Sequence, residues 1–175
     1  TLGATSCPTS STINPDDAPT QVGGGTADDR DGLPTVDPAR VLMDLYLQTD
    51  GPRWERRSGW DALDQFLSTS TDPRQVVSLE NINYCHFYGV FCDAQRNVQI
   101  LTLANNRLRG TVPPEVFSLP RLLSVDVSFN RIDVDLRNVA NALELERLQL
   151  SHTKVTRVDG LGAAAESLTS LFLDG

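Results

Sequence analysis

The sequence predicts an α/β solenoid, in which stacked turns each add one short strand to a parallel sheet, behind a helical cap at the N-terminal end. Two observations predict it. A pattern of aliphatic residues repeats every 23 or 24 residues from Val98 onward. An amphipathic helix with two nearby Trp residues precedes that repeat. We therefore divide the chain into a tail (1–36), a cap (37–97) and about three and a half truncated repeats (98–175).

The repeat places aliphatic residues at the first, fourth and sixth position of each unit. The units begin at Val98, Leu122, Leu145 and Leu168, which are 24, 23 and 23 residues apart. Units of this length bury their apolar faces only against neighbouring units. The fourth unit stops at Gly175, one residue before the expected Asn. We therefore expect the repeats to continue beyond this residue.

Each unit predicts a short strand followed by a sharp turn. Residues between the aliphatic positions alternate in direction, so their side chains face outward on a concave wall. Three residues after the last aliphatic residue come Asn106, Asn130 and, in the third unit, Thr153. A buried amide at this position can satisfy backbone groups that the turn leaves unpaired. These three residues are the predicted turn positions.

The outward residues line up in columns from one turn to the next. For most of them a solvated polar wall is the simpler interpretation, but exposed aromatic side chains on a rigid face are frequent binding anchors. One further column is expected to contain Ala104, Ser128, Ser151 and Asp174. The candidate ligand-binding residues are Thr102, Asn105, Asp126, Phe129, Arg147, Gln149, His152 and Phe172.

The cap begins with a predicted helix of about three turns. Asp37 suits the N-cap, Pro38 the first helical position and Gly51 the C-terminal stop. Trp54 and Trp60 follow among several arginines, and we interpret them as core residues that close one end of the stack. The alternative, a binding hot spot, uses the same residue types.

The tail is rich in Thr, Ser, Pro, Gly and Asp and has few apolar residues. Such a segment does not bury enough surface to order itself. It is either a linker or stalk, or an arm that docks on a partner, with Cys7 as a candidate thiol for a bond to a neighbouring subunit.

The composition excludes several classes of partner. The net charge is −8, with 15 Lys and Arg against 23 Asp and Glu. Phosphate contacts need clustered basic residues, and an anionic membrane surface repels an acidic protein, so neither nucleic acid nor a membrane surface fits. No apolar run reaches the roughly 18 residues that a spanning helix needs.

Cys85 and Cys92 form a close pair that is a disulfide, half of a metal site or two free thiols. A metal site would need more ligands, and the only histidines are His86 and His152. A disulfide in an oxidising compartment is therefore the preferred interpretation.

The chain resembles the extracellular leucine-rich-repeat family of plant receptor-like proteins over residues 37–175. The first repeat carries the longer family signature from Asn106 to Pro113, and the segment from Cys85 to Asp93 is similar to the family's N-terminal cap motif. The resemblance implies a horseshoe-shaped fold, a structural Cys85–Cys92 disulfide and a secreted or cell-surface location. The second repeat, with Val134 to Arg137 in place of Gly-x-Ile-Pro, departs from the plant pattern toward a divergent, algal- or protist-like member.

No catalytic motif is present: there is no Gly-rich phosphate loop, no HExxH and no Gly-x-Ser-x-Gly. We expect no enzymatic activity, no cofactor and no metal. The favoured function is recognition of a protein or peptide ligand through the concave face. The alternative is a structural subunit of a larger extracellular or lumenal assembly, held by the arm of residues 1–36.

Overall fold

The computed structural model describes residues 36–64, 82–164 and 166–174. The chain divides into two units, Thr1–Pro34 and Thr35–Gly175, and every described residue belongs to the second. The elements of this unit, in chain order, are α1 (Pro38–Gln48), η1 (Gly51–Arg53), η3 (Tyr84–His86), β1 (Val90–Cys92), β2 (Val98–Thr102), β3 (Arg109–Val112), η4 (Pro114–Ser118), β4 (Ser124–Asp126), β5 (Arg131–Asp135), η5 (Val139–Asn141), β6 (Arg147–Gln149), β7 (Lys154–Arg157), α3 (Leu161–Ala164) and β8 (Ser170–Phe172).

Helix α1 begins where the sequence predicts. The Asp37 carboxylate accepts a hydrogen bond of 3.0 Å from the Ala39 N–H, and Pro38 occupies the first helical position, where no N–H is needed. One face of the helix is buried, and this face comprises Ala39, Val41, Leu42, Met43, Leu45 and Tyr46. The apolar spacing of the sequence therefore predicts the buried face correctly.

The end of α1 differs from the prediction. The helix stops at Gln48, and Asp50, not Gly51, adopts the left-handed conformation, with φ 60°. Gly51 is needed for another reason, because a Cβ there would lie 2.2 Å from the ring of Tyr46. Close packing against an aromatic ring, and not helix termination, is what this glycine permits.

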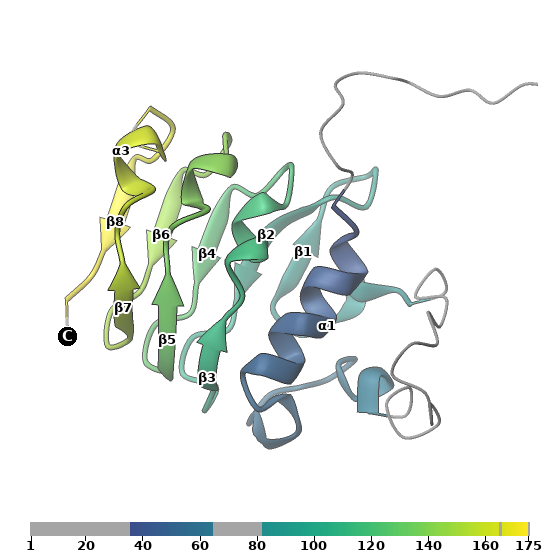
Figure 1. Cartoon of the computed structure of the whole chain (residues 1–175). Coiled ribbons are helices and arrows are strands. Elements are labelled where there is room, and N and C mark those ends of the chain that lie inside the picture. Colours follow the sequence, from purple (N-terminus) through teal and green to yellow (C-terminus); the bar gives the residue numbers. More distant parts are fainter. Residues whose placement is uncertain (1–35, 65–81, 165, 175) are drawn as a thin grey trace, which may run out of the picture. The chain divides into compact units, whose positions relative to one another are not determined.

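The repeats form two sheets. The first has the order β1-β2-β4-β6-β8, and its strands from β2 onward are parallel, as the repeat predicts. Two features were not predicted: β1 from the cap pairs antiparallel with β2, and a second, parallel sheet has the order β3-β5-β7. Figure 1 shows successive turns side by side, with α1 next to β3 at the end where the repeats begin.

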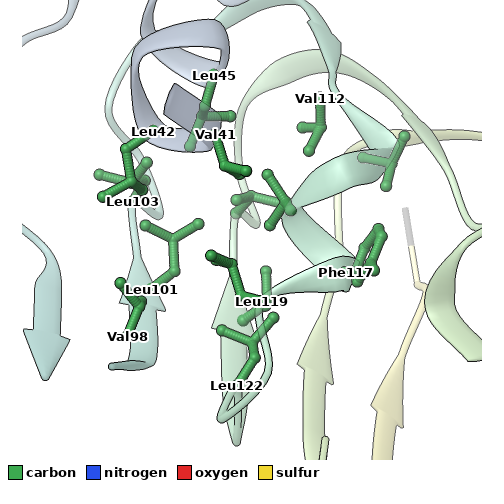
Figure 2. Packing of buried hydrophobic residues seen from close by; sticks show 14 of the residues in the cluster. Val41, Leu42, Leu45, Val98, Leu101, Leu103, Val112, Phe117, Leu119 and Leu122 are labelled. Carbon is green, nitrogen blue, oxygen red and sulfur yellow. The ribbon is translucent and has the colours of Figure 1, made fainter. Parts of the chain in front are cut away.

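The core runs continuously from the cap into the repeats. Register places Leu101, Val125, Leu148 and Leu171 on neighbouring strands at equivalent positions. Side chains of α1 lie over the aliphatic residues of the first turn, as Figure 2 shows for Leu42 beside Leu103. The helix therefore buries the apolar edge that the first turn would otherwise expose.

An aromatic cluster completes the cap. Trp60 stacks on Tyr46 at 5.8 Å between ring centroids and meets Trp54 edge-on at 4.9 Å, and the Phe87 ring centroid lies 4.7 Å from that of Trp60. All four rings are buried. The interpretation of the two tryptophans as core residues is confirmed. Cys85 and Cys92 form a disulfide, with 5.6 Å between their Cα atoms, that ties η3 to β1.

Candidate functional site: the outer face of the five-stranded sheet

The turns that support the outer face are held by a buried amide. The Asn130 Oδ1 accepts hydrogen bonds from the backbone N–H groups of Asn106 and Leu108, each at 3.0 Å. Its Nδ2 donates to the carbonyls of Leu103 and Val127, each at 2.9 Å. One side chain thereby satisfies backbone groups of two successive turns, which fixes the distance between them.

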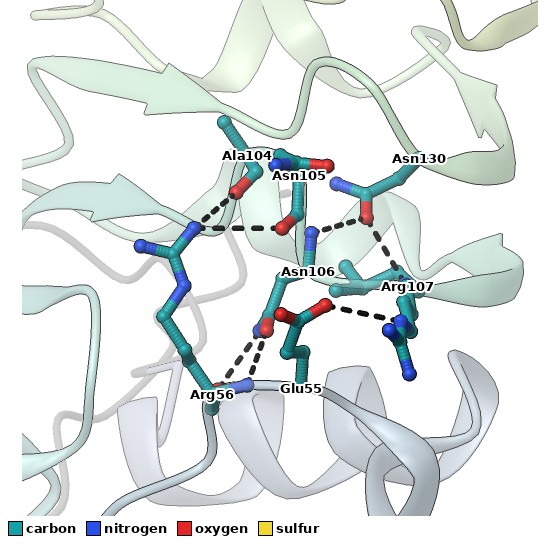
Figure 3. Close-up of polar contacts among 8 residues, drawn as sticks. Glu55, Arg56, Ala104, Asn105, Asn106, Arg107 and Asn130 are labelled. Carbon is teal, nitrogen blue, oxygen red and sulfur yellow. Dashed lines mark hydrogen bonds and ion pairs between the residues drawn. The ribbon is translucent and has the colours of Figure 1, made fainter.

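The first turn has no preceding repeat, and the cap takes that place. The Asn106 Oδ1 accepts from the Arg56 N–H at 2.6 Å, and its Nδ2 donates to the Arg56 carbonyl at 2.9 Å. The Arg56 guanidinium also donates to the carbonyls of Ala104 and Asn105, at 3.1 and 3.4 Å (Figure 3). Arg56 is one of the arginines beside the two tryptophans, and no motif in the sequence predicts this role.

Thr153 occupies the equivalent position in the third turn but bonds more simply. Its Oγ1 donates to the Leu150 carbonyl at 2.6 Å. A hydroxyl is one donor, whereas an amide has two donors and a strong acceptor. The third turn is therefore tied less firmly than the first two.

The outer face is formed by side chains that β2, β4, β6 and β8 present in register. Thr102, Asp126, Gln149 and Phe172 form one row across the four strands. Arg147 lies in the adjacent row and is exposed. Phe172 is 48% exposed, whereas the other three members of its row are half-buried.

A second row lies at the end of the strands, where the chain turns away. Asn105, Phe129 and His152 all have positive φ, at 49°, 55° and 57°, and all are exposed. A bulky residue is sterically disfavoured in this conformation. The backbone N–H of each of the three residues donates a hydrogen bond of 2.8–2.9 Å to a carbonyl of the next turn, which offsets part of this steric penalty. The acceptors are the carbonyls of Ser128, Ser151 and Asp174.

The rings of Phe129 and His152 lie against each other on this row, with 4.5 Å between their centroids. Phe129 is 57% exposed. Beside them the Ser151 hydroxyl donates to the Asp174 carboxylate at 2.7 Å and lowers the pKa of that carboxyl, which therefore carries its charge at neutral pH. The row thus combines an aromatic pair with a fixed negative charge.

Ser128 does not point outward as predicted; it is buried. Its hydroxyl donates to the Asp126 carboxylate at 2.6 Å, and its N–H donates to the same oxygen at 3.0 Å. The Asp126 side chain thereby forms a local turn with Ser128. Such side-chain bonds to nearby residues compete with the regular strand geometry, and an alternating sequence pattern does not reveal them. One carboxylate oxygen of Asp126 therefore already accepts two hydrogen bonds within its own turn.

Phe91 belongs to the outer face although it is not among the residues predicted to bind a ligand. Because β1 extends the sheet, Phe91 faces Ile100 of β2, and the two side chains are 55% and 38% exposed. In the structure Val90 is buried, Phe91 exposed and Cys92 half-buried, but the three residues are all apolar, so the sequence carries no alternation that could have identified this strand.

These residues offer a rigid surface for contact. Among the described residues, no three His, Cys, Asp or Glu side chains gather as a metal site would require. Within the same ranges, no helix is both long and apolar enough to cross a membrane. Aromatic anchors surrounded by polar side chains are the residue types that bind other proteins.

The chain matches known proteins of one kind. No protein-family model matches it. It is 40% identical over 58 residues to receptor-like protein 7 of Arabidopsis thaliana, a match that covers 33% of this chain and 6% of that protein. The chain therefore spans a small part of the length of this relative.

Solved structures extend the match to most of the chain. The leucine-rich-repeat ectodomain of the Arabidopsis receptor kinase HAESA, with an extended IDA peptide hormone, is 25% identical, with a TM-score of 0.55 over 78% of this chain and 20% of that one. The BIR2 ectodomain from Arabidopsis thaliana is also 25% identical, with a TM-score of 0.54 over 78% of this chain and 66% of that one.

The matched parts are receptor ectodomains, which confirms the prediction of a non-catalytic domain. The parallel repeat sheet, the cap and the Cys85–Cys92 disulfide agree with the same kind of protein. The chain has the leucine-rich-repeat fold and is similar to the ectodomains of plant receptor-like proteins.

Proposed function

We propose that this domain recognises a protein or peptide ligand through the outer face of its five-stranded sheet. One observation carries the proposal: three exposed phenylalanines, Phe91, Phe129 and Phe172, belong to this sheet and to the turns at its strand ends. Exposed aromatic side chains on a preformed face are frequent anchors of protein interfaces. Such side chains supply most of the binding energy in protein interfaces.

The polar members of the face suit the surrounding contacts. Thr102, Gln149 and Arg147 supply hydrogen-bond donors and acceptors between the aromatic side chains. Polar groups around a hydrophobic anchor exclude wrong partners more than they add affinity. The ring of His152 lies tilted against that of Phe129, and a contact that restricts the Phe129 ring before binding would reduce the entropy lost on binding.

The comparisons support the class of ligand. The matched HAESA structure contains a peptide hormone. Because this chain spans 20% of that one, the ligand of this chain belongs to the proposal.

We also propose that the domain acts outside the cell or at its surface. The Cys85–Cys92 disulfide requires an oxidising compartment, and the receptor-like relatives favour the extracellular space over an organelle lumen. The cap would then comprise residues 37–97 and the recognition surface residues 98–175, with Phe91 contributed by the cap.

The test is a selection of binders followed by substitution. Peptides from a displayed random library are selected on the full chain, and their affinities are measured by calorimetry for wild type, Phe129→Ala and Phe172→Ala. We expect Phe129→Ala to weaken binding by about 1–3 kcal/mol. Leu143→Ala is the control, because Leu143 is 76% exposed and lies in the loop between η5 and β6, away from the sheet face.

Selected peptides that bind wild type, Phe129→Ala and Phe172→Ala with equal affinity would overturn the proposal and place the binding surface elsewhere. The alternative function, an assembly subunit held by residues 1–36, concerns residues that lie outside the described ranges except for Val36. That alternative, and the role of Cys7 within it, remains a prediction.

A further inference from the structure

A pocket of about 510 Å³ lies in the cap, at the end of the five-stranded sheet that β1 forms. Residues of η3, of β1 and of the turn that joins β1 to β2 line it. The volume equals about 17 waters at roughly 30 Å³ each and falls within the range of small-molecule sites. Of the outer-face residues named above, Phe91 alone lines this pocket.

One wall of the pocket is apolar. It consists of Val90, the exposed side chain of Phe91 and the Cys85–Cys92 disulfide. The face of an aromatic ring carries negative charge density, which attracts the partly positive C–H groups of a ligand that stacks on it. This wall therefore favours a ligand that presents several C–H groups on one flat side.

The remaining lining residues are polar and provide both hydrogen-bond donors and acceptors. Asp93 and Arg96 contribute a carboxylate and a guanidinium, and Asn83 and His86 contribute an amide and an imidazole. Asn83, His86 and Arg96 are exposed, and Asp93 is half-buried. The pocket thus holds one carboxylate and one guanidinium, whose charges balance, opposite an apolar wall.

The turn after β1 holds the Asp93 carboxylate in place. The carboxylate accepts hydrogen bonds from the Asn97 side chain at 2.9 Å, from the Asn97 N–H at 2.8 Å and from the Gln95 N–H at 2.9 Å. The bond from the Asn97 side chain, more than any other contact, lowers the pKa of Asp93, which is therefore ionised at neutral pH. This acceptor is fixed before a ligand arrives.

The same turn places Arg96 at a steric cost. Its φ is 66°, a conformation that Gly and Asn adopt more readily than Arg. The guanidinium donates to the Ile82 carbonyl at 3.2 Å and lies 5.4 Å from the centroid of the Tyr84 ring. That bond uses one of the five guanidinium donors. A strained residue whose oriented side chain lines a pocket is an observation that points to a ligand.

The lining restricts the chemistry of this ligand. Asp93 would repel an anion and Arg96 a cation. A wholly apolar ligand would displace water from both charged groups without replacing the lost hydrogen bonds. Hydroxyl groups donate and accept, so they pair with all four polar groups of the pocket, whereas a zwitterion pairs with the two charged ones. A neutral ring that carries hydroxyls at its edge and C–H groups on its face meets every requirement.

We propose that this pocket binds a pyranose unit of a neutral saccharide. The C–H face of the sugar stacks on Phe91, and neighbouring hydroxyls donate to the Asp93 carboxylate and accept from the Arg96 guanidinium. The disulfide keeps η3 against β1 and so maintains the pocket. This site does not depend on the proposed recognition of a peptide, because Phe91 is the only residue that the two surfaces share.

The test uses the full chain and three neutral probes, the methyl glycosides of β-D-glucopyranose, β-D-galactopyranose and α-D-mannopyranose. Affinities are taken from amide shifts in heteronuclear NMR spectra. We expect at least one probe to shift the amides of residues 83–96 with a dissociation constant on the order of 1 mM, as suits a ligand of this size. Methyl β-D-glucuronide, an anion, and phenylalanine, an aromatic zwitterion, are the competing probes.

Arg96→Gly and Arg107→Gly form a matched pair of variants. Both arginines have positive φ, at 66° and 60°, so glycine relieves steric strain at either position, but only Arg96 lines this pocket. We expect Arg96→Gly to weaken binding of the neutral probe about tenfold and Arg107→Gly to leave it unchanged. Arg96→Asn, which also tolerates this conformation, should reproduce the loss, and melting curves verify that each variant is folded.

Three results would overturn the proposal. The first is an absence of amide shifts with every neutral probe up to about 100 mM, a hundred times the expected constant. The second is equal affinity of wild type, Arg96→Gly and Arg96→Asn for the neutral probe. The third is tighter binding of the glucuronide or of phenylalanine than of the neutral sugars. None of these measurements uses library peptides or Phe129→Ala, so failure of the peptide-recognition function would be seen separately.

Discussion

The first and the last described turns carry the same aliphatic pattern but differ in burial. Leu101 and Leu103 of the first turn are completely buried, whereas Leu171 and Leu173 at the equivalent positions of the last are 38% and 44% exposed. The first turn is covered by α1 and bordered by β1, while no described residue packs beyond β8. The motif therefore sets the direction of each side chain, and the neighbouring element sets its burial.

The same contrast holds for hydrogen bonds. In the first turn the backbone of Arg56 from the cap bonds to the Asn106 amide and stands in for a preceding repeat. In the third turn Thr153 bonds within its own turn. The cap thus buries the aliphatic side chains of the turn that it covers and also supplies hydrogen-bond partners for its Asn106 amide.

The largest expected effect tests the polar half of this comparison. Asn130→Ala should lower the free energy of unfolding by about 3–5 kcal/mol, because it leaves several buried backbone groups without partners. Thr153→Ala, the matched change, should cost about 1 kcal/mol, since one hydroxyl bond is lost. Urea unfolding followed by circular dichroism measures both. Equal losses would show that the two turns are tied alike.

The apolar half is tested by a matched pair of leucines at equivalent strand positions. Leu101→Ala should cost about 3 kcal/mol, because it opens a cavity in a closed core. In a protein that consists of residues 1–175, Leu171→Ala should cost less than about 1 kcal/mol, because its side chain is then in partial contact with water. The same urea experiment reports both values. A cost for Leu171→Ala as large as that for Leu101→Ala would contradict the role given to the neighbouring element.

A smaller loss of stability is expected when the Cys85–Cys92 disulfide, which lies in the cap, is removed. Replacing both Cys85 and Cys92 with Ala should destabilise the domain by about 2–3 kcal/mol, since a loop of eight residues is released in the unfolded chain. Hydrogen exchange should accelerate in β1 and β2 more than in β6 and β8. Uniform acceleration across the sheet would show that the bond supports the whole stack and not its first turn.

The smallest effect concerns acid. Asp93, just after β1, accepts hydrogen bonds from the side chain and N–H of Asn97 and from the Gln95 N–H, and these hold its pKa below the ordinary 3.8. A lowered carboxyl pKa stabilises the folded state above the unfolded value, and this contribution is lost as pH falls through the folded value.

Stability should therefore decline below about pH 4, and Asp93→Asn should flatten that decline. Urea midpoints between pH 7 and pH 3 measure it. Asp174→Asn, at the exposed end, should flatten the curve less, because Asp174 receives its side-chain bond from the single hydroxyl of Ser151. If the urea midpoints of wild type and Asp93→Asn changed in parallel with pH, Asp93 would not contribute to the loss of stability in acid.

Much of the fold was predictable because its signals are local. The start of α1 follows from Asp37 and Pro38, and the parallel strands follow from aliphatic spacing. The candidate face was harder to predict. Phe129 was selected because its position in the repeat is outward, but Phe91 was missed because its exposure depends on the pairing of β1 with β2. The prediction that Ser128 points outward was wrong, because its hydroxyl donates a hydrogen bond to the neighbouring Asp126 carboxylate.

The sequence by itself determined which side chains of each turn point inward, because strand alternation and helix periodicity are properties of a few consecutive residues. The tertiary structure alone decided which of those residues are buried, as Leu101 and Leu171 show. It also brought Arg109 of one turn opposite Arg131 of the next. Residues that are 22 positions apart in the sequence meet only when the turns stack, and no local pattern encodes that register.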